Sequence, residues 1–215
     1  MALPGCSQDH PAGGRAVGAE AAVAADEAGA RAAFVAYQQA VVDGRGADAA
    51  SRVTAGTIDH YERLRRLAVA ATVDDLAAEP MVDRLAVVLL RTRFPLGDLE
   101  AATGATVLAG AVDVGMIGRQ VGALVAGDVS VDPTGERVTV SAVDGAGRLL
   151  DVDLAREGSG WKVDLTALLA AADTGLRQLA VAQGVAENDL ILAMVAATTG
   201  VTIGPEIFDP PRPPD

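Results

Sequence analysis

The chain has 215 residues and a formal net charge of −12, from 29 acidic and 17 basic residues. This charge argues against nucleic acid or an anionic membrane as a partner, because an acidic surface repels phosphate groups. Half of the residues are apolar and only 3% are aromatic, so we expect one core, or at most two small ones, built from Val, Leu and Ala. One cysteine excludes an internal disulfide, and together with two histidines (His10 and His60) it argues against a structural zinc site.

The N-terminus contains Leu3, Gly5 and Cys6, which resemble the lipobox of a bacterial lipoprotein, although the apolar segment that normally precedes this motif is missing. One interpretation is a start codon placed too late, with Cys6 lipidated and the protein anchored outside the cytoplasm. The other is an ordinary terminus of a cytoplasmic protein. In both cases residues 1–25, rich in Gly and Ala, are expected to form a disordered segment or tether.

Residues 26–114 show the period of amphipathic helices. The first helix is expected from Asp26 to Gly44. Others are expected at 48–53, 57–68, 81–94, 98–102 and 106–114, and Thr72-Val-Asp-Asp75 is typical of a helix start. Arg63, Arg65 and Arg66 are expected to form a solvated face. The apolar stripes comprise Ala30, Phe34, Tyr37, Val41, Ile58, Tyr61, Leu64, Ala68, Met81, Leu85, Val88 and Leu89.

The stretch from Asp128 to Leu165 alternates apolar and polar residues and is interrupted by three Gly-containing turns. This pattern predicts about four consecutive antiparallel strands in a curved sheet with one dry face and one wet face. The preceding helices should cover the dry face, which gives an α+β fold. Asp151 and Asp153 share the wet face, where the alternation predicts solvated carboxylates and not an acid–base pair or a cation site.

The C-terminal part is expected to be helical again, either as one helix from Leu165 or as a pair hinged near Asp173-Thr-Gly175. A last helix is expected at 188–198, followed by an extended Pro-rich tail at 205–215. The longest uncharged run, Leu190 to Pro205, is too short to span a bilayer. Residues 26–204 are therefore interpreted as a single globular α+β domain.

A long first helix ending in Val42-Asp43-Gly44, together with a meander ending in Gly160-Trp-Lys-Val-Asp-Leu165, resembles the nuclear transport factor 2-like superfamily. Ketosteroid isomerase and scytalone dehydratase belong to this superfamily. The resemblance covers residues 28–170 and implies a cone-shaped cavity between sheet and helices. The chain departs from the pattern in its many helices between 72 and 118, in a missing strand after the second helix, and in its extra C-terminal helices.

The resemblance implies that Phe34, Tyr37, Tyr61 and Trp161 bind a ligand in this cavity. Tyr37 is separated from the glycine turn by about as many residues as the oxyanion-hole tyrosine of ketosteroid isomerase is from its own turn. No motif matches the acid and base of that enzyme. His60 is a candidate general base at the edge of a helix stripe. Asp113 either points into the cavity or caps the turn at 115–118, and capping is the favoured role.

Because a complete catalytic set is missing, the first expectation is a non-catalytic binding or accessory protein. Its cavity or sheet face would bind a small apolar molecule or a protein partner. The alternative is an isomerase, dehydratase or cyclase that uses Tyr37, His60 and Asp113. A third expectation is a homodimer formed through the wet face of the sheet. Neither a metal nor a cofactor is expected.

Overall fold

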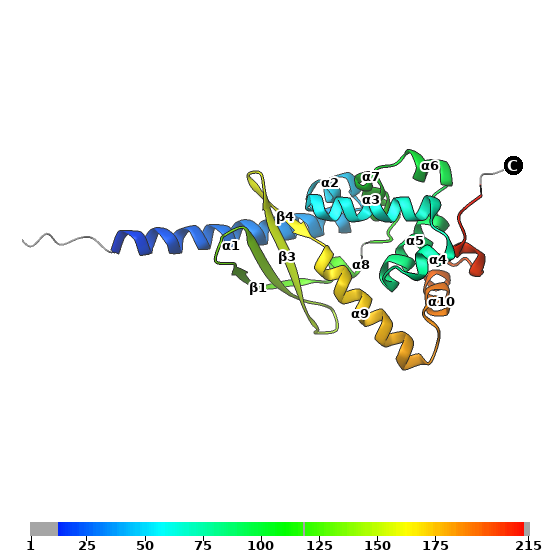
Figure 1. Ribbon diagram of the computed structural model, residues 1–215. Coiled ribbons are helices and arrows are strands. Elements are labelled where there is room, and N and C mark those ends of the chain that lie inside the picture. Colours follow the sequence, from blue (N-terminus) through cyan, green and yellow to red (C-terminus); the bar gives the residue numbers. More distant parts are fainter. Residues whose placement is uncertain (1–12, 118, 213–215) are drawn as a thin grey trace, which may run out of the picture.

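The computed structural model describes residues 13–117 and 119–212 (Figure 1). Helices precede a four-stranded antiparallel sheet and further helices follow it, so the predicted α+β class is confirmed. Cys6, the predicted lipidation site, and His10 lie outside the described residues.

The sheet is an antiparallel meander of β1 (Val125–Val131), β2 (Arg137–Val143), β3 (Leu149–Glu157) and β4 (Gly160–Asp164), in the order of the chain. All three connections fall at the predicted glycine turns. Gly135, Gly147 and Gly158 have φ angles of 71°, 79° and 61° there, and a Cβ atom disfavours this left-handed conformation. The sheet begins slightly before the expected start at Asp128, and its first strand contains a bulge between Ala126 and Val129.

One face of the sheet is buried and the other is polar, as the alternation predicts. On the polar face the hydroxyl of Ser141 donates a 3.0 Å hydrogen bond to Asp151, and that of Thr139 donates a 2.8 Å bond to Asp153. Each pair consists of residues directly opposite on β2 and β3. The buried face carries Val138, Val140, Ala142, Val152, Leu154, Trp161 and Val163.

Helix α1 (Gly13–Val42) lies against the buried face of the sheet and extends beyond it (Figure 1). Its predicted stripe, from Ala30 to Val41, is buried. Part of the predicted disordered tether, residues 1–25, is helical, because α1 begins at Gly13 and not at Asp26. Residues 20–25 consist of Glu, Ala and Val, and their side chains are exposed. They form a helix without packing against the domain because alanine has the highest helix propensity of all residues.

A layer of shorter helices follows α1: α2 (Gly46–Ser51), α3 (Ala55–Ala70), α4 (Val73–Ala77), α5 (Met81–Arg93), α6 (Leu96–Ala101), α7 (Gly104–Asp113) and α8 (Arg119–Gly122). Threonine hydroxyls cap three of them, since Thr54, Thr72 and Thr103 each accept a hydrogen bond from an amide of the first turn. No helix was predicted at α8, and the boundaries of the other helices lie within a few residues of the predicted ones.

The arginines of α3 do not form the solvated face that was expected. Arg63 pairs with Glu79 and Asp83, and Arg65 pairs with Glu62 and donates to the carbonyl of Leu99. A run of charges in the sequence cannot reveal partners that belong to other helices. The prediction was therefore wrong for Arg63 and Arg65, whereas Arg66 is exposed as expected.

Helix α9 (Thr166–Gln183) is continuous through 173–175, where a hinge was one of two predictions. Asp173 accepts a 3.1 Å hydrogen bond from the amide of Val82, so its side chain ties α9 to the start of α5. The break comes instead at Gly184, with a φ of 65°, before α10 (Glu187–Thr199).

The first residues of the predicted Pro-rich tail are folded against the domain. The segment forms a short 3-10 helix, η1 (Pro205–Phe208), and Phe208 is only 3% exposed. Arg91 of α5 donates to the carbonyls of Ile207 and Asp209 at 2.9 Å each. The same guanidinium donates to three carbonyls at the end of α3, those of Leu67, Ala68 and Ala71.

Within the described ranges, no individual helix has both the length and the apolar character required to cross a bilayer. Helices α9 and α10 reach that length and composition only as a pair, across a bend of 103°.

Candidate functional site

All four residues predicted to bind a ligand belong to the buried core of the domain. Phe34 and Tyr37 are each 1% exposed, and Trp161 is 9% exposed. Trp161 packs against α1, where a Cβ atom at Gly29 would come within 3.2 Å of the indole. The guanidinium of Arg156 lies 4.4 Å from its ring centroid. Phe34, Tyr37 and Trp161 are packed into the apolar core and do not line either of the two pockets described below.

The hydroxyl of Tyr37 is buried and has no hydrogen-bond partner among the residues described. Burial raises the pKa of Tyr37 above its ordinary value, because an ionised phenolate would lose its hydration. The side chain is therefore a neutral phenol, and no hydrogen bond joins it to His60 or Asp113.

Asp113 has a capping role at the C-terminal end of α7. Its Oδ1 atom accepts a 2.7 Å hydrogen bond from the amide of Gly46, the first residue of α2. The carboxylate thus meets the positive end of that helix. Capping was the favoured prediction, but the capped element is α2 and not the turn at 115–118.

His60 contacts a carboxylate that the sequence analysis did not single out. Its Nε2 atom lies 3.1 Å from Oδ1 of Asp83, at the start of α5. The angles do not make this contact a directed hydrogen bond. The side chain of His60 is 17% exposed and that of Asp83 only 2%. The imidazole thus lies in contact with a nearly buried carboxylate.

Asp83 is the centre of a charged cluster between α3 and α5. Its second carboxylate oxygen pairs with Arg63, which also pairs with Glu79. Burial alone would raise the pKa of Asp83, but the contacts with His60 and Arg63 outweigh it and hold the pKa below the ordinary value. Asp83 is therefore charged at neutral pH.

An apolar pocket of about 160 Å³ lies next to this cluster, between α3, α5 and α7. The turn that contains Met116 and Ile117 forms a further part of its wall. No charged side chain is part of its wall, and its only hydroxyl belongs to Tyr61. The lining residues are Tyr61, Leu64, Val82, Leu85, Ala86, Leu89, Leu90, Ala111, Met116 and Ile117.

Tyr61 is thus the one predicted ligand-binding residue that lines this pocket. Burial, and to a smaller extent the nearby Tyr37 and Asp83, raise the pKa of Tyr61 above its ordinary value. The phenol stays neutral and can donate a hydrogen bond. Its side chain is 9% exposed, and its hydroxyl makes no hydrogen bond to the described part of the chain.

The sequence alone did not point to Asp83 or to most residues of the pocket wall. Leu85 and Leu89 belong to a predicted apolar stripe, but a stripe does not show whether its residues meet other side chains or leave a space. The only feature of Asp83 visible in the sequence is its place in the first turn of a predicted helix, where a carboxylate stabilises the helix. Its pairing with α3 depends on tertiary structure.

Comparisons of the chain with protein-family models, with curated proteins and with solved structures found no match. The site is therefore interpreted from its own geometry. Among residues 13–117 and 119–212, no group of three or more His, Cys, Asp or Glu side chains is arranged to hold a metal ion.

Proposed function

We propose that the chain is a non-catalytic binding or accessory protein whose apolar pocket between α3, α5 and α7 takes a small apolar molecule. The observation that carries this proposal is the pocket wall, which contains aliphatic side chains, one methionine and one phenol, without any charge. An apolar cavity of this size holds a molecule about as large as benzene. Ligand sites are typically apolar with few polar groups.

Tyr61 would provide the polar contact of this pocket. A neutral phenol without a protein partner favours a ligand that carries one acceptor, such as a carbonyl or hydroxyl oxygen, over a pure hydrocarbon. A charged ligand would be excluded, because no wall residue compensates its lost hydration. The proposed ligand class is therefore a neutral molecule of six to ten heavy atoms, roughly the size that such a cavity holds.

A thermal-shift screen with toluene, cyclohexanone and cyclohexanol tests the proposal. A ligand that binds only the folded state raises the midpoint of unfolding as its concentration exceeds Kd. Ala86→Leu should remove this shift, since Ala86 lines the pocket and the larger side chain fills it. Ala193→Leu, at an exposed position of α10, is the control and should keep it. A shift of equal size in both variants would refute the proposed site.

An acid–base enzyme of the isomerase, dehydratase or cyclase type is the second candidate. It is favoured by the contact of His60 with Asp83, because a carboxylate beside an imidazole orients the ring in many acid–base sites. Such an enzyme should exchange the acidic C–H protons of unsaturated ketones with deuterated solvent. His60→Gln should abolish the exchange detected by NMR, whereas the binding proposal predicts no exchange in either protein.

We also propose that the chain belongs to the nuclear transport factor 2-like superfamily. A further proposal is that two copies form a homodimer through the polar face of the sheet. An exposed apolar row supports the dimer: Val125, Val143 and Leu149 are direct neighbours on three strands, and Val125 and Leu149 are 69% and 75% exposed. Leu149→Asp should then shift sedimentation from dimer to monomer. Val181→Asp, on α9 and 82% exposed, should not. A monomeric native protein at high concentration would contradict the dimer.

A further inference from the structure

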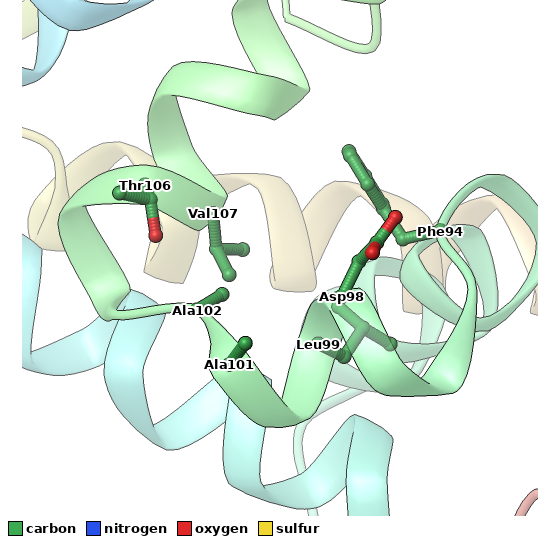
Figure 2. A pocket seen from close by; sticks show the side chains of 7 residues that line it. All are labelled: Phe94, Asp98, Leu99, Ala101, Ala102, Thr106 and Val107. Carbon is green, nitrogen blue, oxygen red and sulfur yellow. The ribbon is translucent and has the colours of Figure 1, made fainter.

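A second pocket, of about 300 Å³, lies between α6 and α7 and is separate from the pocket next to His60 (Figure 2). Its wall contains Leu99, Ala101, Ala102 and Val107, which are apolar, and the ring of Phe94. The side chains of Phe94 and Asp98 stand on one side of the opening and that of Val107 on the other (Figure 2).

The local sequence explains why the ring of Phe94 is held at this pocket. Phe94 directly precedes Pro95, the N-cap of α6, and Leu99 lies in the following turn. Apolar residues at these two positions commonly pack together and fix how the chain enters a helix. Phe94 also packs on α7, where a Cβ atom at Gly110 would come within 3.1 Å of its ring. The aromatic wall is therefore part of the helix packing.

Asp98 is the one charged residue of the pocket wall. Its carboxylate is exposed and forms neither an ion pair nor a side-chain hydrogen bond within the described ranges. The hydroxyl of Thr106, the other polar group of the wall, is already used: it donates to the carbonyl of Thr103 at 3.0 Å and accepts from its amide at 2.8 Å. The unused polar group of this pocket is therefore an anion.

We propose that this pocket binds the ammonium end of a linear aliphatic primary amine. The amine is protonated at neutral pH, and its charge would pair with Asp98 and lie against the face of Phe94. The methylene chain would contact Leu99, Ala102 and Val107. The net charge of −12 favours cations over anions near the surface.

A titration followed by ¹H–¹⁵N NMR with 1-aminohexane, 1-hexanol and hexanoate tests this site on the full chain. We expect saturable shifts at the amides of Leu99, Ala102 and Val107 with the amine. Hexanol should bind at least fivefold more weakly, because it keeps the alkyl chain and lacks the charge. Hexanoate should bind more weakly still. Equal binding of hexanol and 1-aminohexane would overturn the proposal.

Two matched variants separate the site from general attraction to an acidic protein. Asp98→Asn removes the carboxylate of the wall and should weaken binding of 1-aminohexane at least fivefold. Glu100→Gln removes a charge from an exposed residue of the same helix that does not line the pocket, and it should change the affinity less than twofold. An equal loss of affinity for 1-aminohexane in the two variants, or no loss of affinity in either, would contradict a specific site. Circular dichroism confirms that both variants are folded.

Discussion

The Oδ1 atom of Asp83 lies 3.1 Å from Nε2 of His60, while the other oxygen of this carboxylate pairs with Arg63. Two side chains of α3 therefore converge on one nearly buried carboxylate at the start of α5. This contact joins the two helices that form most of the apolar pocket wall. The charged cluster and the pocket thus depend on the same helix packing.

Asp83→Asn should lower the free energy of unfolding at pH 7 by roughly 2 kcal/mol, a value between those of exposed and fully buried ion pairs. The pKa of Asp83 is lowered in the folded state from 3.8. Its charge therefore stabilises the fold above that pH, and the stabilisation is lost as the pH falls through the folded-state pKa. Urea unfolding should be measured from pH 7 to pH 2. The free energies of unfolding of the wild type and the variant should become equal at the acidic end of this range.

Asp74→Asn is the control for this measurement, since Asp74 is exposed in the first turn of α4 and has no ion-pair partner within residues 13–117 and 119–212. It should cost less than about 0.5 kcal/mol. A constant difference between wild type and Asp83→Asn over the whole pH range would mean that the charge of Asp83 does not stabilise the fold.

Tyr37→Phe should leave the stability unchanged or increase it by up to about 1 kcal/mol, because it removes a buried hydroxyl that has no partner. Thr57→Val provides the contrast. The hydroxyl of Thr57 is fully buried and accepts a 3.0 Å hydrogen bond from the amide of Leu165, so its loss should cost roughly 1–2 kcal/mol. If Tyr37→Phe proves as costly as Thr57→Val, the phenol has a partner, such as an internal water.

Gly46→Ala should destabilise the fold by roughly 2 kcal/mol or more, as expected for overpacking against main chain. Its Cβ atom would collide with the carbonyl of Ala109, at 2.6 Å from the carbonyl carbon, and with the Asp113 carboxylate that caps α2. Gly97→Ala in α6 meets no atom within 4 Å and should be neutral or stabilising, since alanine favours helices. Thermal unfolding of both variants measures the difference, and similar midpoints would rule out the close approach of α2 and α7.

Arg91→Lys should lower the stability by roughly 1–3 kcal/mol, because a lysine cannot reproduce the fork of donors to carbonyls of α3 and of the terminal segment. Hydrogen exchange should accelerate most at residues 207–209, which Arg91 holds. Arg93→Lys is the matched change, since Arg93 makes a single long contact of 3.4 Å to Thr198. Unchanged exchange at 207–209 in Arg91→Lys would show that this segment is held by other contacts.

The sequence predicted the sheet because two independent signals agreed. Val138, Val140, Val152 and Leu154 alternate with polar residues, and glycines with positive φ stand between the strands. The helical stripe on α1 was equally clear, since Phe34 and Tyr37 recur at helical spacing and both are buried. These features depend on local periodicity, which the sequence displays directly.

The site could not be predicted in the same way. Tyr61 was named, but Asp83, Met116 and Ile117 become its neighbours only when α3, α5 and the turn after α7 pack together. The same limit applies to Asp113, whose capped amide belongs to Gly46, far away in the sequence. Periodicity shows which face of an element is buried but not which residue of another element it meets.

We propose that a small neutral molecule enters the pocket lined by Tyr61, Leu85 and Met116. A methyl NMR titration with cyclohexanone measures this directly. We expect saturable shifts at the methyl groups of Leu85, Met116 and Ile117, weaker binding in Tyr61→Phe, and no binding in Ala86→Leu. Unchanged spectra of the native protein at saturating cyclohexanone, or the same shifts in Ala86→Leu, would contradict it.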